Sequence, residues 1–312
     1  MHSQPNVKLL SILDLCAVFF LFLAIGTSSF ANATEVGATT IDAVPPRQPS
    51  VFYGNAWSIY LDGIIDQTTA NKVEQLIISQ NIPHLSTIFF NSPGGSLYGG
   101  MELGRIIRKY RLVTSVGSKP IVNDSASLNK QIGATCFSAC ALAYLGGVFR
   151  NMDDKSRYGV HRFYIKEDIY LSADMAQIIS GEIVSYLRSM DIDTDLFNLS
   201  TRAGAQDIFQ PGLQMLKKLN VVNNGFTKPT WSLETTNGML YLKGERDSIY
   251  GINKFLILCA NKTPFLYIIF DAQRREDELM KMPSHSLLLD GKPTRVALAS
   301  RKTIENGWFN GT

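Results

Sequence analysis

A lone serine between two cysteines is the first place in this sequence where chemistry could occur. The stretch CFSAC runs from Cys136 to Cys140 and continues as ALAYLGG, a run of small apolar residues typical of a buried helix. Ser138 therefore falls at the predicted start of that helix, where free backbone N–H groups favour a developing negative charge. Two roles are open to Ser138: a helix N-cap, which is the commoner use of serine there, and a catalytic nucleophile.

A second stretch could supply the donors that a nucleophilic serine requires. The segment NSPGGS, residues 91–96, ends a predicted strand with two adjacent glycines, Gly94 and Gly95. Such a turn exposes backbone N–H groups and lets a ligand approach the main chain closely. These groups could stabilise the oxyanion that follows attack on a carbonyl, although an ordinary turn is the alternative interpretation.

A histidine is needed as the base, and the chain offers three after its first few residues. His84 precedes a predicted strand, and His285 lies in the C-terminal part of the chain. His161 lies on the predicted strand YGVHRFY, the next element after the Ser138 helix. Because the ends of consecutive parallel strands meet along one sheet edge, His161 is the candidate general base. A satisfied core histidine is the alternative.

The two cysteines beside Ser138 allow several interpretations. Side chains four apart on a helix are separated by about 5–6 Å between Cβ atoms, which is wider than a disulfide requires. A Cys136–Cys140 disulfide therefore needs Cys136 to lie outside the helix, and both the bridged and the free states stay open. A redox switch acting on Ser138 is a further alternative. No metal site is predicted, because C-x3-C without a neighbouring histidine is a weak signal.

The elements that must position these residues follow an alternating pattern. Strand-like and helix-like segments alternate over residues 56–223, which predicts an α/β domain. Within it, helical spacing predicts one helix over about residues 69–80, with Val73, Leu76 and Ile77 on one face, and a second within residues 100–110, with Leu103, Ile106, Ile107 and Tyr110 on one face. Ser172 is predicted to cap a third helix. Residues 34–55 are predicted to form a flexible lead-in. Residues 231–312 contain short apolar runs and an Asn237-Gly238 turn signal, which predict a small β-rich C-terminal domain.

The N-terminus has the order of segments found in a secretory signal peptide. Lys8 precedes an apolar run, Leu9 to Gly26, and Ala31 and Ala33 then form an A-x-A cleavage pattern. A retained membrane anchor is the alternative, but Asp14 within the run argues against it. We expect residues 1–33 to be removed and the protein to be exported, periplasmic or secreted. Contact with the membrane is then expected only before cleavage, and disulfides become permissible.

The overall charge gives no indication of a nucleic-acid partner. The chain has 30 lysines and arginines against 27 aspartates and glutamates, a formal net charge of +3. Nucleic-acid-binding domains carry a concentrated basic surface, and so small an excess does not predict one.

Taken in order, these stretches resemble one known family. IFFNSPGGSLYGGMELGRII, CFSACALAYLGG and YGVHRF are similar to segments of the Clp protease proteolytic subunit and its crotonase-superfamily relatives, and above all to exported Clp-protease-like proteins. The resemblance covers residues 56–223 and implies a Clp-protease/crotonase-like ββα superhelix there. It does not reach residues 231–312.

The resemblance also implies roles for individual residues. Ser138 would be the nucleophile and His161 the general base, with an oxyanion hole formed by the N–H groups of Gly95 and Ala139 while Gly94 shapes the turn. Asp207 is the nearest carboxylate to the place where the family has its third, orienting residue. A Ser–His dyad without an acid is the alternative. The family further implies peptide or protein substrates, a homo-oligomer, and no cofactor or metal.

Two other functions remain to be distinguished from a serine peptidase. Crotonases act on acyl-CoA thioesters, generally with glutamates as acid and base, whereas here the corresponding positions hold serine and histidine. Export would also separate the protein from coenzyme A. A catalytically weak or inactive binding or scaffold protein of the cell envelope, with the C-terminal domain as its working part, is the main alternative.

Overall fold

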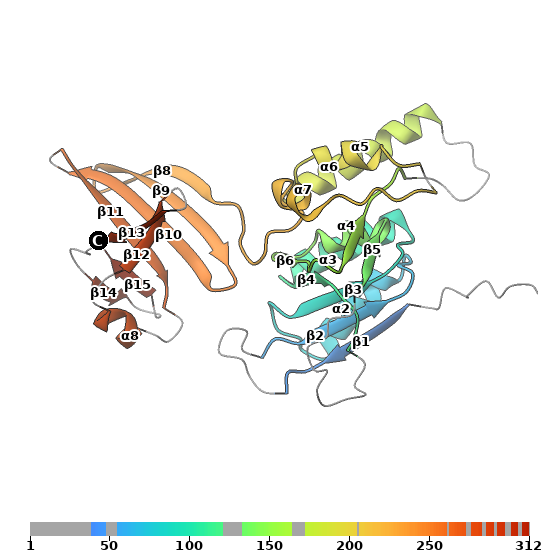
Figure 1. Ribbon diagram of the computed structural model, residues 1–312, viewed down its shortest axis with the longest axis horizontal. Helices are drawn as coiled ribbons and strands as arrows, with labels where there is room; N and C mark the ends of the chain where they lie inside the picture. The colour runs from blue at the N-terminus through green and yellow to red at the C-terminus, as the bar shows by residue number, and fades with distance from the viewer. Residues whose placement is uncertain are drawn as a thin grey trace, which may run out of the picture. The chain divides into compact units, whose positions relative to one another are not determined.

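The computed structural model describes most of the chain between residues 39 and 311 (Figure 1). The described residues are 39–47, 55–120, 133–163, 172–204, 206–260, 262–272, 276–282, 285–289, 292–296, 301–304 and 308–311. The predicted signal peptide, residues 1–33, lies outside them. Within the described ranges, no helix is both long enough and apolar enough to cross a membrane.

A five-stranded sheet forms the centre of the N-terminal part. Its order is β1-β2-β3-β4-β6, with β2, β3, β4 and β6 parallel and β1 antiparallel to β2. The strands are β1 (Thr40–Val44), β2 (Ser58–Asp62), β3 (Thr87–Asn91), β4 (Val113–Val116) and β6 (Arg150–Asn151). Alternate residues of β2 and β3 are fully buried, as expected for strands that face a hydrophobic core on one side.

The prediction of a flexible lead-in over residues 34–55 is wrong for its middle part. Residues 40–44 form β1, which pairs with the whole of β2 from Thr40–Asp62 to Val44–Ser58. Ile41 and Ala43 pack against the core from this edge. The segment holds three apolar residues, Ile41, Ala43 and Val44, which is too short a run to identify a strand by itself. The strand forms because the unpaired edge of β2 offers a complete row of hydrogen-bonding partners.

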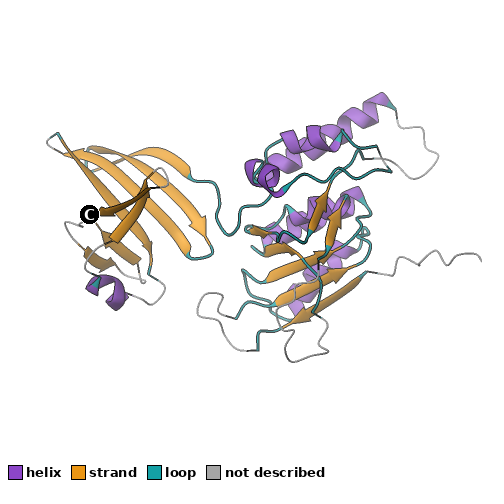
Figure 2. Ribbon diagram, in the orientation of Figure 1, coloured by secondary structure: helices purple, strands orange, loops and turns teal. Residues whose placement is uncertain are grey.

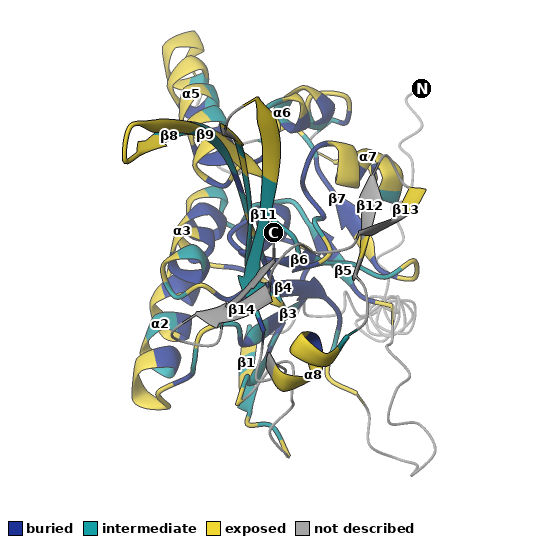
Figure 3. Cartoon of the chain, turned by 90° about the vertical axis from the view of Figure 1, so that its left-hand side faces the viewer, coloured by how far each residue is buried: buried dark blue, intermediate teal, exposed yellow. Residues whose placement is uncertain are grey.

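Two amphipathic helices follow β2 and β3 and cover the sheet. They are α2 (Thr69–Ser79) and α3 (Leu97–Lys109), both close to the predicted ranges. The residues at helical spacing that were expected to face the core are buried, apart from Leu76 and Tyr110, which are half-buried against it, while the opposite face of each helix is exposed (Figure 3). Ser96 caps α3, since its side chain accepts a hydrogen bond from the N–H of Gly99.

A second, two-stranded parallel pair carries the candidate site. It consists of β5 (Thr135–Phe137) and β7 (Arg157–Gly159), and the short helix α4 (Ala139–Tyr144) begins one residue after β5. Three further helices follow: α5 (Ala173–Ser189), capped by Ser172 as predicted, α6 (Asp195–Ser200) and α7 (Leu213–Lys218). The alternation of strands and helices confirms the predicted mixed α/β class for this part of the chain.

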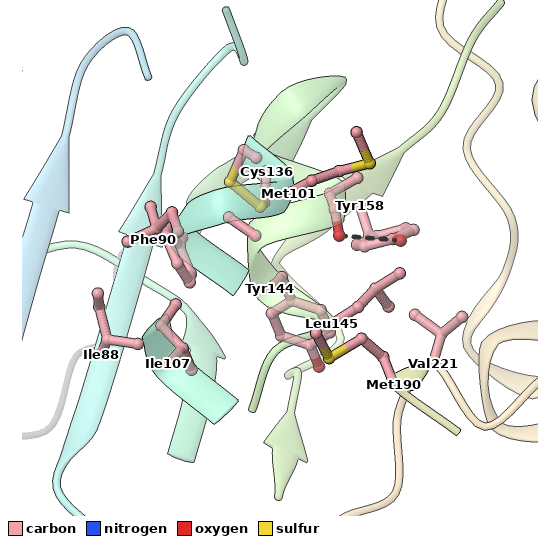
Figure 4. Packing of buried hydrophobic residues seen from close by; sticks show 14 of the residues in the cluster. Ile88, Phe90, Met101, Ile107, Cys136, Tyr144, Leu145, Tyr158, Met190 and Val221 are labelled. Carbon is pink, nitrogen blue, oxygen red and sulfur yellow. Dashed lines mark hydrogen bonds between the residues drawn. A yellow bond between two sulfur atoms is a disulfide. The ribbon is translucent and has the colours of Figure 1, made fainter. Parts of the chain in front are cut away.

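One large cluster of buried side chains joins these elements. The aromatic rings of Tyr144 and Tyr158 lie fully buried in it, in an edge-on contact with ring centroids 5.6 Å apart. The hydroxyl of Tyr158 donates to the carbonyl of Ala141, so the polar end of this ring is satisfied (Figure 4). Burial raises the pKa of Tyr158 well above its usual value, and this hydroxyl therefore stays a neutral donor.

Beyond residue 230 the chain changes to antiparallel strands (Figure 2). A six-stranded sheet has the order β14-β15-β11-β10-β9-β8, and a separate hairpin joins β12 to β13. The elements are β8 (Thr230–Thr236), β9 (Met239–Ser248), β10 (Gly251–Ala260), β11 (Thr263–Asp271), α8 (Glu276–Lys281), β12 (His285–Leu289), β13 (Lys292–Val296), β14 (Arg301–Ile304) and β15 (Trp308–Gly311). The hairpin predicted at Asn237-Gly238 is confirmed, with φ angles of +49° and +77° at the two turn residues.

Candidate active site

Ser138 occupies a sharp turn between a strand and a helix. β5 ends at Phe137 and α4 begins at Ala139, and Ser138 between them has φ +58° and ψ −124°. A side chain with a Cβ atom rarely adopts this conformation, which costs roughly 1–3 kcal/mol and persists only where the surrounding structure imposes it. A serine held on a strained strand-to-helix turn is the arrangement that presents a nucleophilic hydroxyl in other hydrolases.

The N-cap interpretation of Ser138 does not hold. Two other serines of the described chain, Ser96 and Ser172, have extended backbones before their helices, and each accepts a hydrogen bond from the N–H three residues later. Ser138 makes no such capping bond. Ser138 is half-buried, and its hydroxyl makes no hydrogen bond to the start of α4.

A disulfide closes around this turn. Cys136 in β5 and Cys140 in α4 are joined, with their Cα atoms 5.1 Å apart. This is the geometry that the sequence argument required, since Cys136 lies in a strand outside the helix. Both residues are fully buried among the core side chains (Figure 4).

The double glycine lies directly against Ser138. A Cβ atom at Gly94 would stand 2.5 Å from the Cβ of Ser138 and 3.1 Å from the nitrogen of Ala139, so only glycine fits. Gly94 also has φ +110°, a conformation that favours glycine. The segment before it pairs with β5, because the N–H of Ser92 donates to Thr135 at 2.7 Å and Phe137 donates back to Ser92 at 3.1 Å.

Two backbone N–H groups beside the serine are free to donate. The strand-like pairing at Ile65 uses the carbonyl of Gly94 and the N–H of Ser96, which turns the N–H of Gly95 away from Ile65. Ala139 is the first residue of α4, and its N–H has no partner within the helix. Neither Gly95 nor Ala139 donates its N–H to another residue in the described part of the chain. Both are therefore available to an oxyanion.

The base candidate, His161, lies at the same edge as Ser138. β5 and β7 pair in parallel with Phe137 opposite Gly159, and the N–H of Ser138 donates to the carbonyl of Gly159 at 3.0 Å. Ser138 is thus one residue beyond the carboxyl end of β5, and His161 is two residues beyond the end of β7. Neighbouring strands lie about 4.8 Å apart, so the two residues follow adjacent strand ends. The prediction that His161 lies within a strand is wrong by two residues, because pairing with β5 stops at Gly159.

The imidazole of His161 is half-buried and has a defined orientation. Its Nδ1 atom lies 2.7 Å from the carbonyl oxygen of Arg162. A carbonyl oxygen only accepts hydrogen bonds, so Nδ1 carries the proton and, in the neutral ring, Nε2 is the basic nitrogen. The other two candidate histidines lie elsewhere: the exposed ring of His84 bonds the carbonyl of Tyr110, and His285 is in β12.

Asp207, the third residue implied by the family resemblance, lies on the segment that pairs with the His161 strand end. Val160 and Phe209 exchange two backbone hydrogen bonds of 2.9 Å, and Asp207 is two residues before Phe209. The Asp207 side chain is exposed, and its carboxylate lies beside Gly204, as does the guanidinium of Arg162. The observed partner of His161 Nδ1 is the Arg162 carbonyl, so the triad role of Asp207 stays a prediction.

Sequence reasoning missed three contributors to this site, of which two are backbone groups and one is a side-chain hydroxyl. The carbonyl of Arg162 orients His161, the buried hydroxyl of Ser92 accepts the N–H of Gly94 at 3.1 Å, and Ile65 holds the glycine turn through Gly94 and Ser96. The only sequence signal for any of them is Ser92, the first serine of NSPGGS. Backbone groups carry no residue-type signature, and only the pairing of distant segments reveals them.

The arrangement provides the parts for acyl transfer. A serine on a strained turn and two N–H groups without an intrachain partner lie beside the glycine turn, and a histidine with a defined tautomer follows the end of the neighbouring strand β7. No group of three or more histidine, cysteine, aspartate or glutamate side chains suited to a metal ion occurs among the residues described.

Comparison with known proteins gives structural neighbours only. No protein-family model matches the sequence, and no curated protein matches it. Among solved structures, ClpP1 from Listeria monocytogenes is 19% identical with a TM-score of 0.39, over 53% of this chain and 88% of that one. A single-residue mutant of the 1510-N membrane-bound stomatin-specific protease is 15% identical with a TM-score of 0.36, over 53% of this chain and 75% of that one. These likenesses extend over about half of this chain at low identity.

Proposed function

We propose that this protein is an exported serine hydrolase, most simply a peptidase, in which Ser138 and His161 catalyse acyl transfer. The observation that carries the proposal is the conformation of Ser138, with φ +58° and ψ −124° and with no capping bond to α4. A non-glycine residue kept in this conformation needs a reason, and exposing a nucleophile beside two free N–H groups supplies one.

The proposed reaction uses only groups of this chain. The hydroxyl of Ser138 attacks the substrate carbonyl while Nε2 of His161 removes its proton. The oxyanion of the tetrahedral intermediate accepts hydrogen bonds from the N–H groups of Gly95 and Ala139. His161 then protonates the leaving amine, and a water molecule activated by His161 hydrolyses the acyl-enzyme and restores the serine.

The substrate class and assembly state belong to the same proposal. The resemblance of NSPGGS and CFSAC to the Clp protease proteolytic subunit supports a peptide bond as the target and a homo-oligomer as the working form. Export to the periplasm or beyond is supported by the predicted signal peptide and by the Cys136–Cys140 disulfide, since such bonds persist in oxidising compartments.

Active-site labelling tests the proposal directly. The full chain would be treated with a fluorophosphonate probe, which reacts with activated serines, and the modified residue identified by mass spectrometry. We expect labelling at Ser138, none in Ser138→Ala, and a rate at least about 100-fold lower in His161→Ala. Ser172→Ala and His84→Ala are matched controls, because Ser172 is an N-cap serine and His84 a surface histidine, and their labelling should stay within about twofold of wild type.

The alternative function predicts the opposite outcome. If the protein is an inactive binding or scaffold module, the folded wild type reacts no faster with the probe than Ser138→Ala does. Labelling that is spread over several serines, or that is unchanged in His161→Ala, would also contradict the proposed mechanism.

A further inference from the structure

We propose that the Cys136–Cys140 disulfide is a positioning clamp, which holds Ser138 in its strained conformation. The inference rests on the proposed function in one respect only, namely that Ser138 is the nucleophile. The disulfide joins Cys136 in β5 to Cys140 in the first turn of α4. Ser138 is the middle residue of the five-residue loop that it closes.

The contacts around the turn show why a covalent link is useful there. On the strand side, Ser138 is anchored by its N–H bond to Gly159, and Phe137 by its bond to Ser92. On the helix side, α4 packs closely on α3, since a Cβ atom at Gly100 would stand 2.3 Å from the carbonyl of Ala139. The start of α4 has no side-chain cap, so the disulfide is the link that directly joins the two sides across Ser138.

The conformation at Ser138 would relax if the two sides could move. A residue with a Cβ atom prefers negative φ, and a change to negative φ at Ser138 would rotate the start of α4 relative to the end of β5. A bond between residues 136 and 140 limits that movement, because their Cα atoms must stay within the narrow range that a disulfide permits. The clamp therefore opposes the relaxation that the strained serine favours.

Burial distinguishes a clamp from a redox switch. Cys136 and Cys140 are each 0% exposed, so a reductant cannot reach the sulfur atoms while the native fold is closed. Cys259, in β10, is a free and exposed cysteine. The site disulfide thus has the surroundings of a structural bond, and Cys259 provides a matched position for thiol controls.

The test compares the protein with and without the Cys136–Cys140 disulfide. Both cysteines would be replaced together, as Cys136→Ala with Cys140→Ala, and compared with Cys259→Ala in the full chain. Alanine suits α4, whose residues Ala139, Ala141 and Ala143 are already buried. Wild-type protein refolded in the presence of reductant provides a second disulfide-free sample that keeps both side chains.

Amide hydrogen exchange measures how often the turn around Ser138 opens, and it does so whether or not the protein is active. We expect exchange of the amides of Phe137 and Ser138, which donate to the carbonyls of Ser92 and Gly159, to rise at least about tenfold without the disulfide, while exchange in β2 and α2 stays within about twofold. A bond that only stabilises the whole domain would raise exchange throughout the sheet. The Cys259→Ala variant should match wild type throughout.

A double-mutant cycle that combines Ser138→Gly with removal of the disulfide gives a second test, based on melting temperature, that also does not require activity. Glycine tolerates positive φ, so Ser138→Gly should raise the melting temperature by about 2–4 °C while the disulfide is present. Without the disulfide the turn can relax, and Ser138→Gly should then raise the melting temperature by less than half as much. Equal shifts in the two backgrounds would mean that the disulfide and the strain are uncoupled.

Labelling kinetics then connect the clamp to Ser138 reactivity. Removing the disulfide should lower the maximal rate of fluorophosphonate labelling at least about tenfold, with the half-saturating probe concentration within about twofold. Unchanged exchange at Phe137 and Ser138 together with unchanged labelling would overturn the clamp. Absence of labelling in wild type would refute the hydrolase proposal instead, and exchange and the double-mutant cycle would still decide whether the clamp exists.

Discussion

The carbonyl oxygen of Arg162 lies 2.7 Å from Nδ1 of His161. This backbone group does what the aspartate of a Ser–His–Asp triad does for orientation, because it fixes the ring and leaves Nε2 as the basic nitrogen. The carbonyl carries only a partial charge and stabilises a protonated imidazole less than a carboxylate would. The Arg162 guanidinium and N–H both donate to Ala203, at 3.1 and 3.3 Å, which holds that carbonyl in place.

The first prediction concerns Asp207. Because Nδ1 of His161 already donates to a carbonyl and the Asp207 side chain is exposed, Asp207→Asn should reduce the labelling rate of Ser138 by no more than about threefold. Asp174→Asn, a change of another exposed carboxylate in α5, is the control. A loss above about 100-fold, confined to Asp207→Asn, would instead assign Asp207 to a catalytic triad.

The second prediction concerns the contact between Gly94 and the serine turn. In Gly94→Ala the new Cβ would stand 2.7 Å from the carbonyl oxygen of Phe137, a backbone atom, so the turn must move. We expect a loss of about 2–4 kcal/mol in unfolding free energy and loss of labelling at Ser138. Gly181→Ala in α5 has open space and should instead stabilise the helix by about 0.5–1 kcal/mol without affecting labelling. Chemical denaturation of both variants makes the comparison, and equal effects would contradict the contact.

The third prediction separates stability from activity at Ser138. Relief of the positive φ is worth roughly 1–3 kcal/mol, while glycine costs about 0.5–1 kcal/mol in unfolded-chain entropy. Ser138→Gly should therefore be inactive and yet more stable than Ser138→Ala, which keeps the Cβ atom and the strain. Urea unfolding of the two inactive variants measures the difference. A less stable glycine variant would mean that the observed conformation is not strained.

The fourth prediction is a pH dependence at the start of α2. Hydrogen bonds from the hydroxyls of Thr68 and Thr69 lower the pKa of Asp66 to about 2. A carboxylate with a lowered folded-state pKa contributes stability above about pH 4 and loses that contribution as the pH falls through about 2. Its side chain is 50% exposed, so we discount the effect to about 1 kcal/mol.

Asp66→Asn provides the measurement for this pH dependence. The variant should be about 1 kcal/mol less stable than wild type at pH 6 and equally stable near pH 2. Urea unfolding at pH 6, 4 and 2.5 would follow the convergence. A difference that stays constant with pH would show that the hydrogen bonds, and not the charge, account for the stability.

The sequence predicted the local features that residue types encode. The apolar spacing of α2 and α3, the Ser172 cap and the Asn237-Gly238 turn each depend on neighbours within a few residues, and the structure confirms them. The strand β1 was missed, because the apolar run within Thr40–Val44 is short and the segment becomes a strand only beside the free edge of β2.

For the site, the sequence by itself determined which residue types were available: a serine at a helix start, a double glycine after a strand, a histidine in the next strand-like segment and a cysteine pair. The tertiary structure alone decided how they are used. It placed Cys136 in a strand so that the disulfide closes, put Gly94 against Ser138 and gave His161 a backbone partner. Such relationships depend on backbone atoms of segments far apart in the chain, and the pairing of β5 with β7 and with residue 92 brings those atoms together.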